Sequence, residues 1–255
     1  MENRYPLFAG GRILKKESLW DLRDYTYSGW QLQYEGYTDG IINGCGIHVE
    51  GMNLIVGRGM LKCQDFIYLI GEKVIIPFTA ENQTTALKAS FDVKHNHSDF
   101  ITYEVNFFLD HELERQPNQI ELCRFHLREG SSLRDHYENF RDIRTEYDTL
   151  NLVDATIAGK SLTGIHPMII NKYIEQLPEL KEPADFGFAY IAMQTEGWVN
   201  RKTLALYLAN KIPNITWQEV CGWDNNLIVD KLEAFLDYKY ENGKYNPHKN
   251  VIFVD

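Results

Sequence analysis

Glycine is concentrated in one part of the chain, and this limits the folds available there. Residues 34–63, YEGYTDGIINGCGIHVEGMNLIVGRGMLKC, contain seven of the eighteen glycines. Asp39-Gly40, Asn43-Gly44 and Glu50-Gly51 separate short apolar stretches, and such dipeptides supply the positive φ angles of tight turns. The segments IHV, LIV, FIYLI and KVIIPF that lie between or after them are rich in β-branched and aromatic residues. The pattern predicts a meander of short antiparallel strands.

The same glycines do not form a phosphate loop. A dinucleotide-binding loop needs GxGxxG at the start of a helix, but Gly44-Cys45-Gly46 runs into Ile47-His48-Val49, which is typical of a strand. AGKS at residues 158–161 resembles the end of a nucleotide-binding P-loop, yet that motif requires glycine where the chain has Asp154. Phosphate binding is therefore not expected at either place.

Further strands are predicted at residues 85–93, 100–109 and 119–127. In the last of these, apolar residues from Cys123 to Leu127 alternate with polar residues from Arg124 to Arg128, as in a half-buried strand. The period then changes: Leu133, Tyr137, Phe140, Ile143 and Tyr147 recur at steps of four, three, three and four. This spacing places them on one face of a helix over about 131–148, with Ser131 or Ser132 as its N-cap.

The last third of the sequence is typical of helices. Residues 151–164 are interpreted as a linker, after which Pro167 stands in the tolerated first turn of a helix. Thr216 to Glu219 forms a capping box ahead of a short helix. A helix is expected at 226–240, and Asn242-Gly243 opens a terminal hairpin.

Together these patterns predict an α+β fold. It consists of a β-rich docking domain at 1–150, ending in the 131–148 helix, a linker at 151–164 and a small helical domain with the terminal hairpin at 165–255.

The first forty residues mix aromatic with polar side chains, which predicts irregular segments held in place by large rings. Aromatic rings are favoured at interfaces because each covers much area at little cost in conformational entropy. The rings form a candidate interface, with the alternative that they fold back onto their own chain. They are Trp20, Tyr25, Tyr27, Trp30, Tyr34 and Tyr37.

Charge and cysteine usage exclude several kinds of protein. The net charge of −10 repels nucleic-acid phosphates and anionic lipids. The longest apolar runs, such as Phe188 to Met193, are far too short for a membrane span, and no signal peptide is evident. The four cysteines lack CxxC spacing, so we expect free thiols in a reducing compartment.

No catalytic or metal-ligating constellation stands out, so we expect no enzyme, no metal and no cofactor. KHNH at 94–97 offers two imidazoles without a third or fourth ligand, and we interpret it as a hairpin loop. There is no GxSxG motif and no local signature of a nucleophilic cysteine. Carboxylates are plentiful, but sequence spacing cannot establish the separation that a glycosidase pair requires.

Residues 19–70 contain a "DG(I/L)I.GC" turn, a strand and then "I.V..G....(G/C)..Y". With IELCRFHLREG and EYDTLNLVDATIAG further on, this resembles N-terminal domains of small proteins encoded with phage-type contractile tails in Firmicutes, over roughly residues 10–160. The resemblance implies a structural, non-enzymatic part at or near the baseplate of a phage, a phage-tail-like bacteriocin or a related injection machine. It implies that the protein is made in the cytoplasm and then incorporated into the particle. Its partners would be other tail or baseplate proteins and copies of itself, with a tail fibre as a further candidate, without nucleic acid or membrane insertion.

Two other functions stay open at this stage. In the first, Trp20 and Trp30 would stack on the sugar rings of a cell-surface glycan that is bound or cleaved. In the second, the C-terminal helices and hairpin would form a winged-helix DNA-binding regulator. Residues 201–255, however, carry equal numbers of basic and acidic side chains, whereas a DNA-reading face is usually clearly basic.

Overall fold

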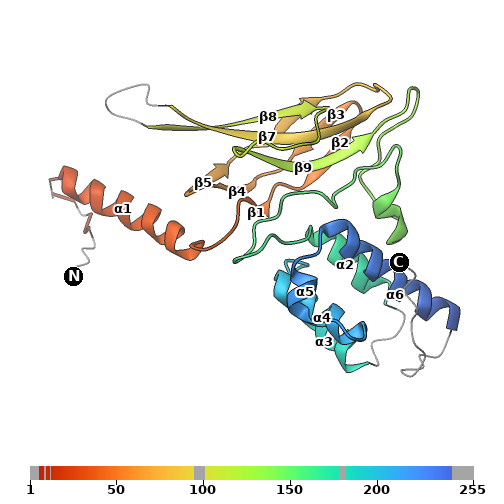
Figure 1. The fold of residues 1–255 in the computed structure, drawn as a ribbon. Helices are drawn as coiled ribbons and strands as arrows, with labels where there is room; N and C mark the ends of the chain where they lie inside the picture. Colours follow the sequence, from red (N-terminus) through yellow and green to blue (C-terminus); the bar gives the residue numbers. More distant parts are fainter. Residues whose placement is uncertain (1–5, 9, 12, 95–100, 178–181, 243–255) are drawn as a thin grey trace.

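The protein is described by a computed structural model that places residues 6–8, 10–11, 13–94, 101–177 and 182–242. The predicted α+β class is confirmed: antiparallel three-stranded sheets come first and a helical region follows (Figure 1). One long helix, α1 (Lys16–Gln33), precedes the sheets and projects away from them.

The strands form three antiparallel sheets, with orders β1-β4-β5, β2-β3-β6 and β8-β7-β9. Their bounds are β1 Gly40–Gly44, β2 Ile47–Glu50, β3 Asn53–Val56, β4 Gly59–Cys63, β5 Phe66–Ile70, β6 Val74–Pro77, β7 Thr84–Lys94, β8 Thr102–Asp110 and β9 Gln119–His126. The helical elements that follow are η1 Arg141–Arg144, α2 Pro167–Glu175, α3 Pro183–Gln194, α4 Arg201–Lys211, α5 Trp217–Cys221 and α6 Asn225–Asn242.

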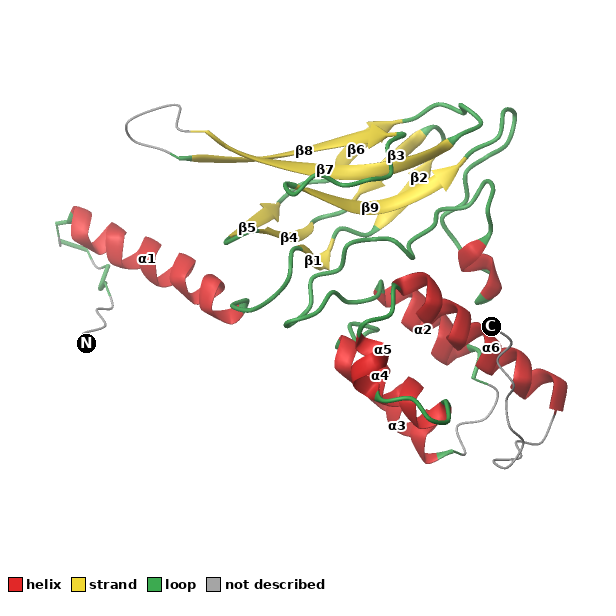
Figure 2. Cartoon of the chain, in the orientation of Figure 1, coloured by secondary structure: helices red, strands yellow, loops and turns green. Residues whose placement is uncertain are grey.

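The sheet β8-β7-β9 lies over the two smaller sheets (Figure 2). Aromatic rings from the two layers contact each other. Phe66 of β5 stacks on Tyr103 of β8 with ring centroids 3.5 Å apart, and Tyr68 meets Phe91 of β7 at 4.6 Å. Strand β7 pairs with a neighbour on each side, and its side chains from Thr85 to Ala89 are all buried. The apolar core therefore lies between sheets and continues below them into the helices.

Local sequence signals predict most of these elements correctly. The strands expected from IHV, LIV, FIYLI and KVIIPF are β2, β3, β5 and β6, and the three longer strands are β7, β8 and β9. Pro167 stands at the start of α2, and the Thr216 capping box opens α5. The KHNH loop and the terminal hairpin lie largely or wholly outside the described residues.

The helix predicted at 131–148 is wrong. Only the 3₁₀ turn η1 is helical there, although Leu133, Tyr137, Phe140 and Ile143 are buried as expected. The backbone of Arg134 pairs instead with a distant segment, donating to the carbonyl of Asp148 at 3.0 Å and accepting from Leu150 at 2.8 Å. Side chains also capture backbone N–H groups: Asp142 accepts from Glu138 and Gln176 accepts from Phe140. These competing bonds replace the i to i−4 ladder of a helix.

The irregular structure expected for the first forty residues is also wrong at residues 16–33, which form α1. The segment has no proline and contains good helix formers such as leucine, lysine and glutamine. Glu17 in the first turn is favourable beside the positive end of the helix dipole.

The segment predicted as a linker, 151–164, lies along the β-region. Ile41 donates its N–H to the carbonyl of Thr156 at 2.8 Å, and Ala158 donates to the carbonyl of Ile41 at 2.9 Å. Val153 and Ile157 are buried. The Asn225 side chain of α6 donates to the carbonyl of Val153 at 2.8 Å, so the segment contacts both regions. The domain boundaries themselves stay a prediction.

His166 gives α2 a pH-sensitive cap. Its Nδ1 accepts the backbone N–H of Met168 at 3.2 Å, which requires a neutral ring, and desolvation lowers the pKa of this imidazole to about 4. Because the unfolded chain binds a proton near pH 6.5, this group's contribution to stability is full above that pH and is lost as pH falls toward 4.

We expect the unfolding free energy of the wild type to fall by about 1 to 2 kcal/mol more than that of His166→Asn between pH 7.5 and 5.0. Asparagine keeps the N-cap acceptor without titrating. Urea denaturation at the two pH values measures the difference, and parallel losses in the two proteins would contradict this role for His166.

Candidate functional site: the first helix and its grooves

Helix α1 contains no buried residue along its eighteen positions. Its large apolar side chains are all exposed and are Leu19, Trp20, Leu22, Tyr25, Tyr27, Trp30 and Leu32. No side chain caps its N-terminus at Lys15. Isolated helices of this length are marginal in water and usually depend on packing of an apolar face. The described part of the chain leaves that face uncovered.

Helical spacing sorts these side chains into two faces. At 3.6 residues per turn, Leu19, Trp20, Tyr27 and Trp30 share one side, and we call these four residues the aromatic stripe. Lys16 lies over the ring of Trp20, with its Nζ 5.2 Å from the ring centroid. Tyr25 lies on the opposite side of the helix.

The C-terminal half of the aromatic stripe borders an apolar groove. Tyr27 and Trp30 form one wall, and Met60, Phe66 and Leu69 of β4 and β5 form the other, around a volume of 360 Å³. Leu69 is 76% exposed although it belongs to a strand. The groove therefore lies between exposed apolar side chains of the helix and exposed apolar side chains of the sheet.

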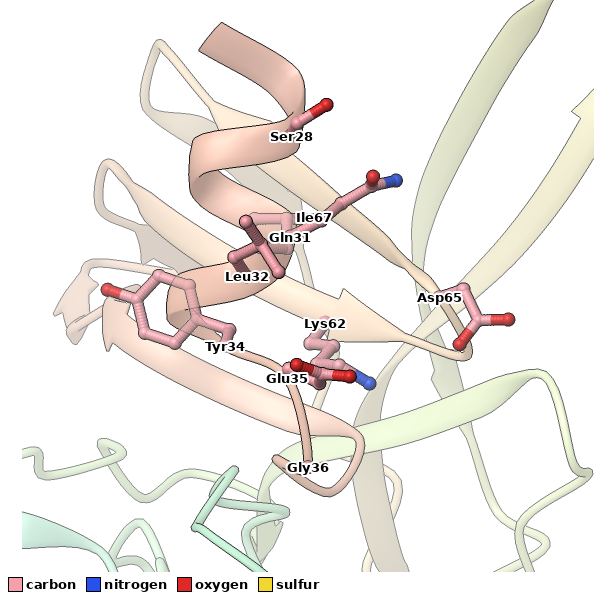
Figure 3. A pocket seen from close by; sticks show the side chains of 9 residues that line it. All are labelled: Ser28, Gln31, Leu32, Tyr34, Glu35, Gly36, Lys62, Asp65 and Ile67. Atoms are coloured by element: carbon pink, nitrogen blue, oxygen red, sulfur yellow. The ribbon is translucent and has the colours of Figure 1, made fainter. Parts of the chain in front are cut away.

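A second groove, of 480 Å³, lies at the C-terminal end of the helix and is more polar (Figure 3). Gln31, Glu35, Lys62 and Asp65 bring an amide, two carboxylates and an ammonium group to it. Lys62 Nζ lies 3.7 Å from Asp39 Oδ1 and also donates to the backbone carbonyl of Gln64. The ammonium group is thus already partnered within the chain.

Tyr34 and Tyr37 attach the end of α1 to the body of the protein. Tyr34 stacks parallel to Trp30 with centroids 6.2 Å apart and meets Tyr37 edge-on at 5.3 Å. Tyr37 forms a backbone bridge with Lys160. Burial raises the pKa of the Tyr34 phenol. These two rings set the direction in which α1 leaves the sheets.

The structure thus divides the six aromatic residues expected at an interface. Trp20, Tyr25, Tyr27 and Trp30 lie on α1, while Tyr34 and Tyr37 lie at its junction with the β-region. Trp20 and Trp30 are ten residues apart, about 15 Å along the helix axis, so they cannot stack on one sugar ring. Their role in binding a partner stays a prediction.

Sequence reasoning did not find Leu19, Met60, Phe66 and Leu69. Leu19 was detectable, because positions 19, 20, 27 and 30 repeat with a helical period. The sheet residues carried no such signal, since their role depends on where α1 lies.

Among the described residues, no group of three His, Cys, Asp or Glu side chains is placed to hold a metal ion. Burial raises the pKa of Cys45 to about 12 and that of Cys63 to about 11, and burial likewise raises the pKa of Cys123. These thiols therefore stay protonated at neutral pH. No described helix is both long enough and apolar enough to cross a membrane.

Comparison with known proteins gives a likeness of fold at low identity. No family model and no curated protein sequence matches the chain. Its structure is similar to the type VI secretion system TssK–TssF–TssG baseplate subcomplex, with a TM-score of 0.43 and 8% identity, covering 92% of this chain and 100% of the matched one. It is also similar to the crystal structure of TssK, with a TM-score of 0.42 and 8% identity, covering 93% of this chain and 72% of that chain.

Proposed function

We propose that this protein is a structural, non-enzymatic component of a contractile tail-like particle, at or near the baseplate. In this proposal α1 is the element that joins it to a baseplate protein, a fibre or a neighbouring subunit. The observation that carries the proposal is that α1 buries none of its own side chains while presenting the aromatic stripe.

The energetics favour a partner on this helix. Trp20 is 48% and Tyr27 is 57% exposed. Covering either ring completely would contribute about 2 to 3 kcal/mol, at roughly 25 cal/mol per Å² of apolar area. Leucine and tryptophan side chains held on a preformed helix also lose little entropy on docking. Helix-in-groove recognition works through such a set of anchors at helical spacing.

The class of particle comes from the sequence resemblance over roughly residues 10–160, and the net charge of −10 agrees with a protein partner rather than nucleic acid or an anionic membrane. The likeness to the two TssK structures has TM-scores below 0.5, so the proposal rests on the surface of this chain.

Replacing Trp20 by alanine should weaken binding to the particle at least tenfold without changing the fold. Trp20 contacts only Lys16 among the described ring contacts and is not part of the core, whereas exposed rings at the centre of an interface are typical hot spots. Contractile tail particles assembled without this protein, from the same source genome, would be mixed with purified chain and sedimented. The bound fraction is measured against chain concentration.

Tyr25→Ala is the matched control. The sequence groups Tyr25 with the other candidate interface rings, but on the helix it lies opposite the aromatic stripe and is 77% exposed, so the proposal leaves it outside the contact. We expect it to bind like the wild type. Failure of the wild type to co-sediment, or equal binding of wild type and Trp20→Ala, would overturn the proposal. Saturable quenching of tryptophan fluorescence by cell-wall fragments, with no co-sedimentation, would instead favour the glycan-binding alternative.

A further inference from the structure

Helix α3 presents a second uncovered face, and this one is uncharged. Phe186, Tyr190 and Met193 are 57%, 58% and 60% exposed, and Ile191 is 41% exposed. The rings of Phe186 and Tyr190 stack with centroids 6.5 Å apart. The charged residue of α3, Asp185, points the other way and is completely buried. In Figure 1, α3 lies at the bottom of the helical region, on the side away from the sheets.

A glycine stands in the middle of this face without a reason inside the chain. Gly187 is helical, and a Cβ added there would meet no atom within 4 Å. Glycine inside a helix costs about 1 kcal/mol relative to alanine. By helical spacing Gly187 lies between Tyr190 and Ile191 on the exposed side. A residue without a side chain at this position allows a second backbone to approach closely.

We infer that the occupant of this face is a second copy of the same chain, with α3 crossing α3 of its partner near Gly187 about a twofold axis. In a twofold contact each side chain near the axis meets its own counterpart. Any charge there would face a like charge, so a self-interface must be uncharged at its centre. The exposed face of α3 meets this condition.

The strong negative net charge of this chain makes an uncharged centre especially important for contact between two copies. At −10, two copies repel each other over most of their surfaces. A different protein partner would be steered and selected by complementary charges, and the face of α3 offers none for such selection. Helix α1, by contrast, carries Glu17, Arg23 and Asp24 among its apolar residues. The two surfaces therefore suit different partners, and this inference does not depend on the proposed function.

The size of the face limits the strength of the contact. The four exposed apolar side chains offer roughly 400 Å² per copy, about half of a standard interface. We therefore expect self-association in the micromolar range, not a permanent dimer. Sedimentation velocity of the full chain from about 1 to 200 µM should show a monomer that converts to a dimer.

Gly187→Leu separates loss of the interface from loss of the fold. Leucine has room within one copy and is a better helix former, so the urea midpoint of the variant should stay equal or rise. A large side chain at the crossing should nevertheless weaken dimerisation at least tenfold. Tyr190→Lys, which puts two like charges beside the axis, should do the same.

Tyr25→Lys is the matched control, since it places the same charge on an exposed ring position of α1, and it should dimerise like the wild type. A wild type that stays monomeric at 200 µM would overturn the inference. So would undiminished association of Gly187→Leu, or association lost in Trp20→Ala but kept in Tyr190→Lys. Loss of particle binding by Trp20→Ala with dimerisation intact would support both the proposed function and this inference, because it would show that the two surfaces bind different partners.

Discussion

Replacing Lys211 by methionine should lower the free energy of unfolding by about 3 to 5 kcal/mol at pH 7. Lys211 Nζ lies 2.8 Å from Asp185 Oδ1 and also pairs with Glu182. Asp185 is fully buried, so removing the ammonium group leaves a carboxylate without its compensating charge inside the helical region. Burial alone would lower the pKa of Lys211, but the carboxylates of Asp185 and Glu182 raise it above its ordinary value.

The loss of stability should exceed that of a single ion pair, because Lys211 and Asp185 belong to a chain of hydrogen-bonded side chains. The Tyr207 hydroxyl donates to Asp185 Oδ1 at 2.7 Å, and the hydroxyls of Tyr207 and Tyr173 are 2.6 Å apart. These groups come from α2, α3 and α4, so the network fixes how the three helices meet. Urea denaturation monitored by circular dichroism measures the effect.

Lys202→Met on the same helix is the matched control, because Lys202 is exposed, and it should change stability by less than about 0.5 kcal/mol. Adding Asp185→Leu to Lys211→Met should recover part of the loss by removing the buried carboxylate from which the Lys211 ammonium group has been taken away. Equal losses of unfolding free energy in Lys211→Met and Lys202→Met would contradict a stabilising role for the ion pair between Lys211 and Asp185.

Local signals were sufficient wherever a few adjacent residues decide the structure. Asn43-Gly44 and Glu50-Gly51 end β1 and β2, and both glycines have positive φ angles. The Thr216 capping box forms as the sequence predicts, with both of its reciprocal bonds. Such features depend on contacts within four residues, so they can be recognised without knowing the rest of the fold.

Tertiary contacts decided the rest. Four of the five apolar positions at 133–147 are buried, the exception being Tyr147. The backbone of Arg134 nevertheless pairs with Asp148 and Leu150, and this overrides the helix. The Asp185 network joins residues that are up to 38 positions apart, from Tyr173 to Lys211, and no local pattern announces it. Helix α1 was missed for a different reason. Its apolar side chains lie on both faces and none is buried, so the sequence lacks the single apolar face that marks a packed helix.

The candidate site was predictable only in part. Four of the six aromatic residues expected at an interface lie exposed on α1. The opposing wall of the groove, from Met60 to Leu69, follows from the position of α1 beside β5, which the turn at Gly36 and the packing of Tyr34 determine. Whether a partner occupies the groove is a question for the binding experiment.

Gly44→Ala should destabilise the protein by about 3 to 5 kcal/mol, far more than the same change at Gly51. Both glycines have left-handed backbone angles, with φ of +67° and +60°. A Cβ at Gly44 would lie 2.3 Å from the carbonyl oxygen of Arg58 and 2.7 Å from the Cα of Gly59, where β1 and β4 meet in register. Backbone atoms cannot swing aside as a flexible side chain can, so the strands must separate.

Gly51→Ala measures the part of the destabilisation that comes from the left-handed backbone angle alone. A Cβ at Gly51 would meet no atom within 4 Å, so only the left-handed angle opposes alanine, at about 1 to 2 kcal/mol. The difference between the two variants in urea denaturation therefore measures the steric cost of forcing apart β1 and β4. That cost should also appear as faster amide exchange at Cys45, whose N–H donates to the carbonyl of Arg58 at 2.9 Å. Equal destabilisation by the two changes would mean that the strands can yield at Gly44, and that turn conformation alone fixes this part of the sheet.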